Sequence, residues 1–97
     1  MVLTCKIHGQ RATFLVDAGA TVSMVSKELY NRLPIEVRPP LFLVNAACGL
    51  TYVKPIGWGN FNIDNEHGNM CVGTMLVADL PSQRYEGIIG MGLLVKL

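Results

Sequence analysis

The sequence predicts a small all-β protein, and three observations lead to that prediction. Apolar and polar residues alternate through most of the chain, and β-branched and aromatic residues are frequent in the alternating stretches. Turn-forming glycine, proline, asparagine and aspartate separate these stretches at short intervals. Only residues 26–33 and the last few residues have a pattern that favours a helix. We therefore expect about six or more strands with one or two short helices.

The first strands are expected to form a hairpin. Residues 2–7 and 11–16 are rich in β-formers, and residues 8–10 between them include a glycine at a turn position. Apolar character resumes at residues 22–25. Ser26 then has the character of an N-cap for a helical turn, which Pro34 must end.

The central part of the chain predicts a second, long hairpin. Residues 41–47 and 51–56 are apolar, and Cys48-Gly49-Leu50 lies between them. Residues 58–63 continue the strand pattern.

The C-terminal third predicts a polar turn, a strand and a short buried segment. Residues 64–69 are all polar or glycine, which is typical of a turn. Residues 70–78 read as a strand, and residues 80–85 as a loop that contains a proline. Residues 87–90 are two isoleucines between glycines, as in a short buried strand.

The size and composition indicate one domain that associates with itself. Ninety-seven residues, taken here as a single domain over 1–97, bury only a modest core. The sequence is nevertheless 51% hydrophobic and only 15% charged. A subunit interface or a groove for apolar peptide would account for the excess of apolar residues.

Charge and cysteine content exclude several classes. The net charge of +1, without a run of Lys or Arg, argues against nucleic acid as a partner. The apolar runs are far shorter than the ~18 residues of a membrane span. Three cysteines without Cys-x-x-Cys spacing suggest neither disulfides nor a metal site. They favour a reducing compartment, either the cytoplasm or a particle.

The stretch from residue 14 to 23 carries the strongest chemical signal. Asp17 follows three apolar residues and precedes Ala18, Gly19 and Ala20. A carboxylate at the end of a buried strand costs free energy unless the site needs it, although a turn aspartate that closes a strand would also fit. Of the three aspartates, the two others lie in a polar turn (Asp64) and at a strand end (Asp79), where we expect solvation.

A second stretch, residues 87–94, reads Gly-Ile-Ile-Gly-Met-Gly-Leu-Leu. The two stretches together resemble the retropepsin-like aspartic proteases of retroviruses and retrotransposons. In that family Asp-(Thr/Ser)-Gly-Ala follows an apolar strand, and Ile-Ile/Leu-Gly-x-Asp/Asn-x-Leu precedes a short helix. The resemblance implies a small closed β-barrel-like acid protease fold with a flap hairpin.

The resemblance also implies a mechanism and a set of site residues. Two symmetry-related Asp17 carboxylates of a homodimer would activate a water that hydrolyses peptide or polyprotein substrates, without cofactor or metal. The expected site residues are the catalytic Asp17, the active-site loop Ala18, Gly19 and Ala20, the flap residues Ala46, Ala47, Cys48, Gly49 and Leu50, and the pocket-wall residues Leu15 and Ile88.

Two departures from the family pattern leave an alternative open. Ala18 replaces the usual Thr or Ser, and Gly92 replaces the usual Asp or Asn. A catalytically weak or inactive pseudoprotease that binds peptides or mediates dimerisation is therefore the alternative to an active endopeptidase. A third possibility is a cysteine hydrolase, which would combine Cys48 or Cys71 with His8 or His67. Both histidines lie in predicted turns and are expected at the surface.

Overall fold

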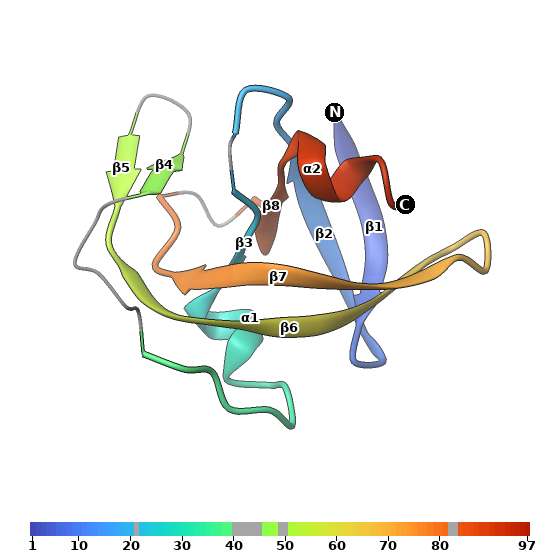
Figure 1. Cartoon of the computed structure of the whole chain (residues 1–97), viewed down its shortest axis with the longest axis horizontal. Coiled ribbons are helices and arrows are strands. Elements are labelled where there is room, and N and C mark those ends of the chain that lie inside the picture. Colours follow the sequence, from blue (N-terminus) through green and yellow to red (C-terminus); the bar gives the residue numbers. More distant parts are fainter. Residues whose placement is uncertain (21, 40–45, 49–50, 82–83) are drawn as a thin grey trace.

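The computed structural model is built around a closed barrel of six strands (Figure 1). The structure describes residues 1–20, 22–39, 46–48, 51–81 and 84–97. Around the barrel the strands follow the order β1-β2-β8-β3-β7-β6, and β4 and β5 form a separate two-stranded sheet. The described part of the chain also contains two helices of one turn each. This confirms the predicted all-β class with a closed barrel and short helices.

Strands β1 (Val2–Ile7) and β2 (Gln10–Val16) form the predicted N-terminal hairpin. The turn between them holds His8 at φ 47° and Gly9 at φ 84°. Two left-handed residues in a two-residue turn match the right-handed twist of the strands, and glycine adopts this conformation without strain. The hairpin register pairs Val2 with Leu15, so Asp17 follows directly at the open end of the hairpin.

The chain then enters β3 (Met24–Ser26) and α1 (Lys27–Tyr30). The Ser26 hydroxyl accepts a hydrogen bond from the Leu29 N–H at 3.1 Å, which confirms the predicted N-cap. Strand β3 lies between β8 and β7, antiparallel to the first and parallel to the second. It therefore links the N-terminal and C-terminal parts of the barrel.

A long antiparallel ribbon crosses the molecule (Figure 1). It consists of β6 (Pro55–Asn65) and β7 (Met70–Ala78), with a register shift between Pro55 and Gly57. The smaller hairpin, β4 (Ala46–Cys48) and β5 (Thr51–Val53), leads into this ribbon. The central hairpin is thus confirmed over these residues. Its predicted strand residues 41–45 lie outside the described part of the chain.

The chain ends with β8 (Gly87–Ile89) and α2 (Met91–Leu94). Strand β8 is parallel to β2 and antiparallel to β3. No helix in the described residues is long and apolar enough to cross a membrane.

The core lies inside the barrel and has two parts. The larger part includes fully buried residues of β1, β2, β6, β7 and α1, among them Ile7, Phe14, Leu29, Phe61 and Val77. A smaller cluster lies by the loop that follows β2. Its buried members are Ala20, Met24, Ala78 and Ile88.

The structure corrects one element boundary that bears on function. Asp64, predicted in a polar turn, belongs to β6, where it pairs with Lys6 of β1 and Met70 of β7. The turn itself is confined to the residues after Asn65, since Asn65 accepts hydrogen bonds through its side chain from the His67 and Asn69 N–H groups. Side-chain bonding of this kind lets the strand run further than composition alone predicts.

Candidate active site

Asp17 lies where β2 ends and is held by three hydrogen bonds. Its N–H donates to the Ile89 carbonyl of β8 at 3.0 Å, and its own carbonyl accepts from the Ala20 N–H at 3.1 Å. One carboxylate oxygen, Oδ1, accepts from the Gly19 N–H at 3.0 Å. These bonds make a tight turn in which the half-buried Asp17 side chain orders its own loop.

The rest of the loop combines exposed and buried positions. Ala18 and Gly19 are exposed, whereas Ala20 is buried in the smaller apolar cluster. A Cβ built on Gly19 would lie 3.5 Å from Asp17 Oδ1, which is ordinary contact. The loop thus leaves the surface beside Asp17 open to an approaching molecule and fixes its far end in the core.

The fold brings the two sequence motifs side by side. Parallel pairing of β2 with β8 places Leu15 opposite Ile88 and Val16 opposite Ile89. Gly90 then packs against the loop, since a Cβ there would lie only 2.8 Å from the Ala20 carbonyl oxygen. The glycine at position 90 is required by this close approach of two backbones.

Comparison with known proteins gives the family. The model of the family described as "gag-polyprotein putative aspartyl protease" matches residues 3–96. The chain belongs to this family. Its fold also matches EIAV protease complexed with the inhibitor HBY-793, with a TM-score of 0.77, 23% sequence identity and coverage of 98% of this chain and 85% of that chain. Among curated proteins, the comparison finds no match.

Family and fold together indicate an aspartyl protease, and the predicted pocket-wall residues lie next to the aspartate loop. Leu15 and Ile88 face one another across β2 and β8 and belong to the smaller apolar cluster. Ile88 is buried at 1% exposed, whereas Leu15 is half-buried. In the single chain Leu15 is therefore the more accessible of the two.

Three of the predicted flap residues lie in the β4–β5 hairpin. Ala46, Ala47 and Cys48 form β4, which pairs with β5. In Figure 1 this hairpin and the loop after β2 both lie toward the top of the view. Gly49 and Leu50, also predicted in the flap, lie outside the described residues.

The other two aspartates lie in different settings from Asp17. Asp79 is exposed directly after β7, as expected. Asp64 is half-buried in β6, beside Lys6 in the register. Asp17 is the aspartate that hydrogen bonds tie to both family motifs.

Cys5 and His8 have surroundings that suit a structural role better than catalysis. Burial, and to a lesser degree the neighbouring Cys71, Asp64 and Glu66, raise the pKa of Cys5 to about 11, which keeps its thiol protonated. His8 accepts a hydrogen bond at Nε2 from the Asn62 N–H and packs edge-on against Phe61. His67 is exposed.

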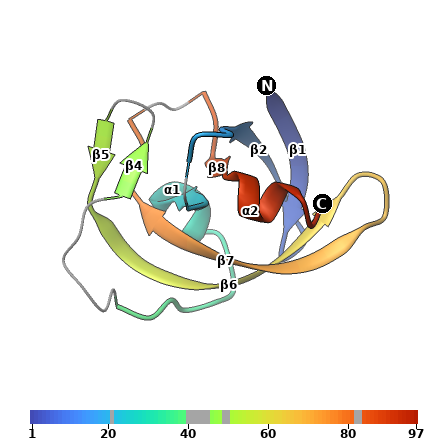
Figure 2. The same cartoon turned by 45° about the horizontal axis from the view of Figure 1, so that its top comes forward.

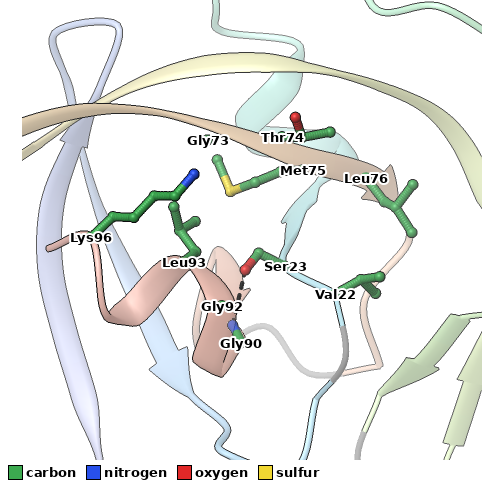
Figure 3. Close-up of a pocket in the computed structure, with 10 residues that line it drawn as sticks. All are labelled: Val22, Ser23, Gly73, Thr74, Met75, Leu76, Gly90, Gly92, Leu93 and Lys96. Atoms are coloured by element: carbon green, nitrogen blue, oxygen red, sulfur yellow. Dashed lines mark hydrogen bonds between the residues drawn. The ribbon is translucent and has the colours of Figure 1, made fainter.

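A cavity of about 340 Å³ lies between β7, α2 and the segment before β3 (Figure 3). Ser23, Leu93 and Lys96 are among its lining residues, and Gly92 borders it with no atom within 4 Å of an added Cβ. The described residues contain no group of three or more His, Cys, Asp or Glu side chains placed to hold a metal ion.

Sequence reasoning gave no role to Ser23. Its hydroxyl accepts a hydrogen bond from the Gly90 N–H at 2.9 Å, a contact between residues 67 positions apart. The available signal was a serine within an apolar run shortly after Asp17.

Proposed function

We propose that this chain is an aspartic endopeptidase that hydrolyses peptide bonds as a homodimer. Residues 1–97 form one subunit, a single retropepsin-like domain, and each subunit supplies one Asp17. The substrate class is a peptide or polyprotein segment bound in extended form.

The observation that carries the proposal is the setting of Asp17. It is the aspartate in an Asp-x-Gly sequence, and its backbone is bonded to Ile89 in the second family motif. Half-burial of its side chain at the end of β2 leaves the carboxylate accessible to a partner carboxylate and to substrate. This arrangement supports a catalytic role that neither exposed Asp79 nor Asp64 in β6 can take.

The chemistry explains why two subunits are needed. An aspartic mechanism uses one ionised carboxylate to take a proton from water and one protonated carboxyl to polarise the scissile carbonyl. Two carboxyl groups at hydrogen-bond distance share one proton, since both cannot ionise together. With one such aspartate per chain, a twofold axis must provide the second. Water then adds to the carbonyl carbon, and the peptide C–N bond breaks as the amine gains a proton.

Exposed apolar side chains support a homodimer. Met1 is 81% exposed, Val2 60% and Met91 47%. The N-terminus and α2 lie near one another (Figures 1 and 2), and Met1 and Val2 share a cavity of about 380 Å³ with Leu94, the last residue of α2. Apolar groups gathered in this way are typical of a surface that a subunit covers.

The substrate would bind between the β4–β5 hairpin and the Asp17 loop. Ala46, Ala47, Cys48, Gly49 and Leu50 form the proposed flap, and Leu15 with Ile88 forms the pocket wall. An extended peptide would pair with the backbone of the flap in the manner of an added strand. Closure of the flap would exclude water from the site.

A pseudoprotease is the second candidate, and Ala18 is the observation that favours it. The exposed Ala18 has no hydroxyl to bond across the axis, and Gly92 lacks the polar side chain usual in the family. The same dimer could then bind peptides with little turnover.

The deciding experiment is peptide cleavage by wild type and Asp17→Asn. The wild type should cleave members of a peptide library between about pH 4 and 7, with a bell-shaped dependence of rate on pH. Asp17→Asn should abolish cleavage, because the amide cannot accept a proton from water, yet it should leave circular dichroism and sedimentation unchanged.

Asp79→Asn is the matched control, since it removes an exposed carboxylate outside the loop. Its activity should equal that of the wild type. Cleavage retained by a well-folded Asp17→Asn protein would end the proposal. Peptide binding without cleavage by the wild type would favour the pseudoprotease.

A further inference from the structure

One peptide unit connects the two ends of the segment that carries Asp17. The Ile89 carbonyl accepts from the Asp17 N–H at 3.0 Å, and the Gly90 N–H donates to Ser23 Oγ at 2.9 Å. This carbonyl and this N–H belong to the same peptide group. Because a peptide group is planar and its C=O and N–H point in opposite directions, Ser23 and Asp17 are coupled through one rigid plane.

Ser23 is well placed to fix that plane. It is only 6% exposed, and its own carbonyl accepts from the Leu76 N–H of β7 at 3.0 Å. Its hydroxyl points at Gly90 from the segment before β3 (Figure 3). Ser23 therefore joins the Asp17 segment, β7 and the junction between β8 and α2.

The sequence of this chain increases the importance of that link. Position 18 is alanine, so the residue next to Asp17 has no hydroxyl with which to hold the loop. Contacts among the described residues of one chain also hold the loop, namely the Asp17 and Gly90 hydrogen bonds and the close approach of Gly90 to the Ala20 carbonyl. The Gly90 hydrogen bond is accepted by the side chain of Ser23.

We infer that Ser23 is a positioning residue for Asp17, acting through the Ile89–Gly90 peptide group. This inference rests on the proposed function for its catalytic consequence. Its structural part, that the Ser23 hydroxyl sets the order of the Asp17 loop, stands on the geometry alone. Loss of the hydroxyl frees the peptide plane to rotate, and the Asp17 backbone moves with it.

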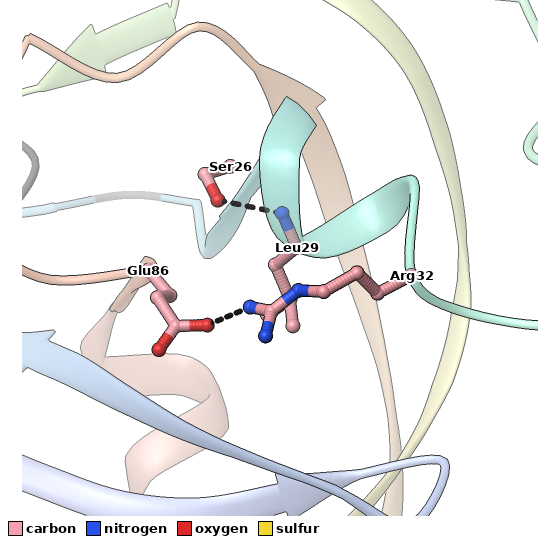
Figure 4. Close-up of polar contacts among 4 residues, drawn as sticks. All are labelled: Ser26, Leu29, Arg32 and Glu86. Carbon is pink, nitrogen blue, oxygen red and sulfur yellow. Dashed lines mark hydrogen bonds and ion pairs between the residues drawn. The ribbon is translucent and has the colours of Figure 1, made fainter.

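The test compares two buried serines. Ser23→Ala and Ser26→Ala each remove a hydroxyl that accepts one backbone N–H, and both serines are 6% exposed. Ser26 caps α1, and its acceptor bond to Leu29 is drawn with the nearby Arg32 and Glu86 (Figure 4). Both variants should lower Tm by similar amounts. Only Ser23→Ala should disturb Asp17.

Amide hydrogen exchange is the first readout, because it does not depend on activity. In Ser23→Ala the Asp17 and Gly90 amides should exchange at least about tenfold faster, while in Ser26→Ala they should match the wild type. Unchanged exchange at both amides in Ser23→Ala would overturn the inference.

Kinetics provide the second readout. Ser23→Ala should lower kcat by about tenfold to a hundredfold and leave KM within about twofold, because orientation of the carboxylate is lost and the groove is kept. The bell-shaped dependence of rate on pH should become narrower. Two carboxylates held less closely interact less, so the two apparent pKa values of the pair lie closer together. Ser23→Thr keeps the hydroxyl, and its extra methyl can enter the adjoining cavity, so it should restore kcat. An equal loss of kcat in Ser26→Ala, or no rescue by threonine, would contradict the positioning role.

The test still applies if Ser23→Ala does not fold or if the protein lacks the proposed activity. If Ser23→Ala does not fold, Ser23→Cys replaces it, since sulfur keeps the size but accepts hydrogen bonds weakly, and the same exchange criterion applies. If the wild type cleaves no peptide, or if Asp17→Asn cleaves as well as wild type, the proposed function fails. The exchange comparison then still supports or overturns the role of Ser23.

Discussion

Ala18 occupies the position next to Asp17, and its methyl group is exposed in the single chain. A larger side chain at this exposed position would not displace any core residue. The family pattern of Thr or Ser here implies a hydroxyl that bonds across the twofold axis. Its absence makes position 18 the simplest place to alter activity without altering the fold.

Ala18→Thr should tighten the dimer and raise turnover. Each subunit regains one hydrogen bond of about 1 kcal/mol, and the total of about 2 kcal/mol corresponds to roughly a thirtyfold change in the dissociation constant of the dimer. Ala18→Val is the matched control, since valine has the shape of threonine without its hydroxyl. Sedimentation and kcat measured for both variants check the effect. An equal gain in the valine variant would assign it to packing instead.

Cys5 is a buried thiol in the core, and its pKa of about 11 lies above the ordinary value of 9.0. The folded protein therefore keeps the proton at a pH where the unfolded chain has released it. Above the unfolded pKa the folded state binds more protons, so stability must fall as pH rises.

The free energy of unfolding should thus decline between about pH 9 and pH 11, by at most about 3 kcal/mol from this group. Urea titrations at stepped pH measure the decline. Cys5→Ala should have a flatter dependence, whereas Cys71→Ala should keep most of it, because burial is the larger cause. A slope identical in wild type and Cys5→Ala would show that the thiol does not contribute.

Asp17 could be singled out from sequence, because an acidic residue between an apolar strand and small residues is locally unusual. The role of Ser23 could not be predicted, because its hydroxyl accepts a hydrogen bond from Gly90, which lies 67 positions away in the sequence. Local patterns indicate which residues are unusual. They do not reveal which distant backbone group a buried hydroxyl will meet.

The element that organises the site is β8, a three-residue strand between β2 and β3. It fits because Gly87 has no side chain: a Cβ there would lie 2.3 Å from Phe14 Cε2 and 2.6 Å from the Met24 carbonyl oxygen. Gly92 in α2 is the opposite case, with nothing within 4 Å. Close packing therefore requires glycine at position 87, whereas nothing in the described part of the structure requires it at position 92.

Gly87→Ala and Gly92→Ala should shift stability in opposite directions. Overpacking at Gly87 should cost about 1–3 kcal/mol or more, because backbone and a buried ring must move. Alanine at Gly92 should stabilise α2 by about 0.5–1 kcal/mol, since glycine is a poor helix residue. Urea unfolding of both variants measures the sign of each change in the free energy of unfolding. A loss at Gly92 as large as that at Gly87 would contradict the open space that the structure shows around position 92.

Element types were predictable where the pattern was local, as in the β1–β2 hairpin and the Ser26 cap. The extension of β6 through Asp64 was not, because composition favoured a turn and tertiary pairing with Lys6 prevailed. The parallel pairing of β2 with β8 also has no local signal. It was not predicted from the sequence.

At the scale of the whole molecule, the chain presents large apolar side chains on the outside of a closed barrel. Met91 is 47% exposed and Met70 is 73% exposed. The first lies in α2 near the N-terminus, and the second lies where β7 begins, beside the β6–β7 turn (Figure 1). If the dimer covers the surface around α2, Met91 is buried between the subunits and Met70 stays exposed to solvent.

Met91→Asp should raise the dimer dissociation constant at least about tenfold, because a carboxylate in an apolar interface loses its hydration. Met70→Asp, the matched control, should leave it unchanged. Sedimentation over a range of concentrations measures both, and specific activity should fall on dilution in parallel. Wild type that is fully active as a monomer would contradict the dimer itself.

The contact between Ser23 and Gly90 also has a consequence for timing. Because the partners are 67 positions apart, a long loop must close before the site exists, and such closure is entropically slow. During synthesis the β1–β2 hairpin can form early, but the Asp17 loop stays incomplete until residues 87–90 have left the ribosome. Ribosome-stalled chains that stop before residue 87 should therefore show protected β1–β2 amides and rapid exchange at Asp17. A nascent chain would then be inert toward its own surroundings until residues 87–90 have emerged.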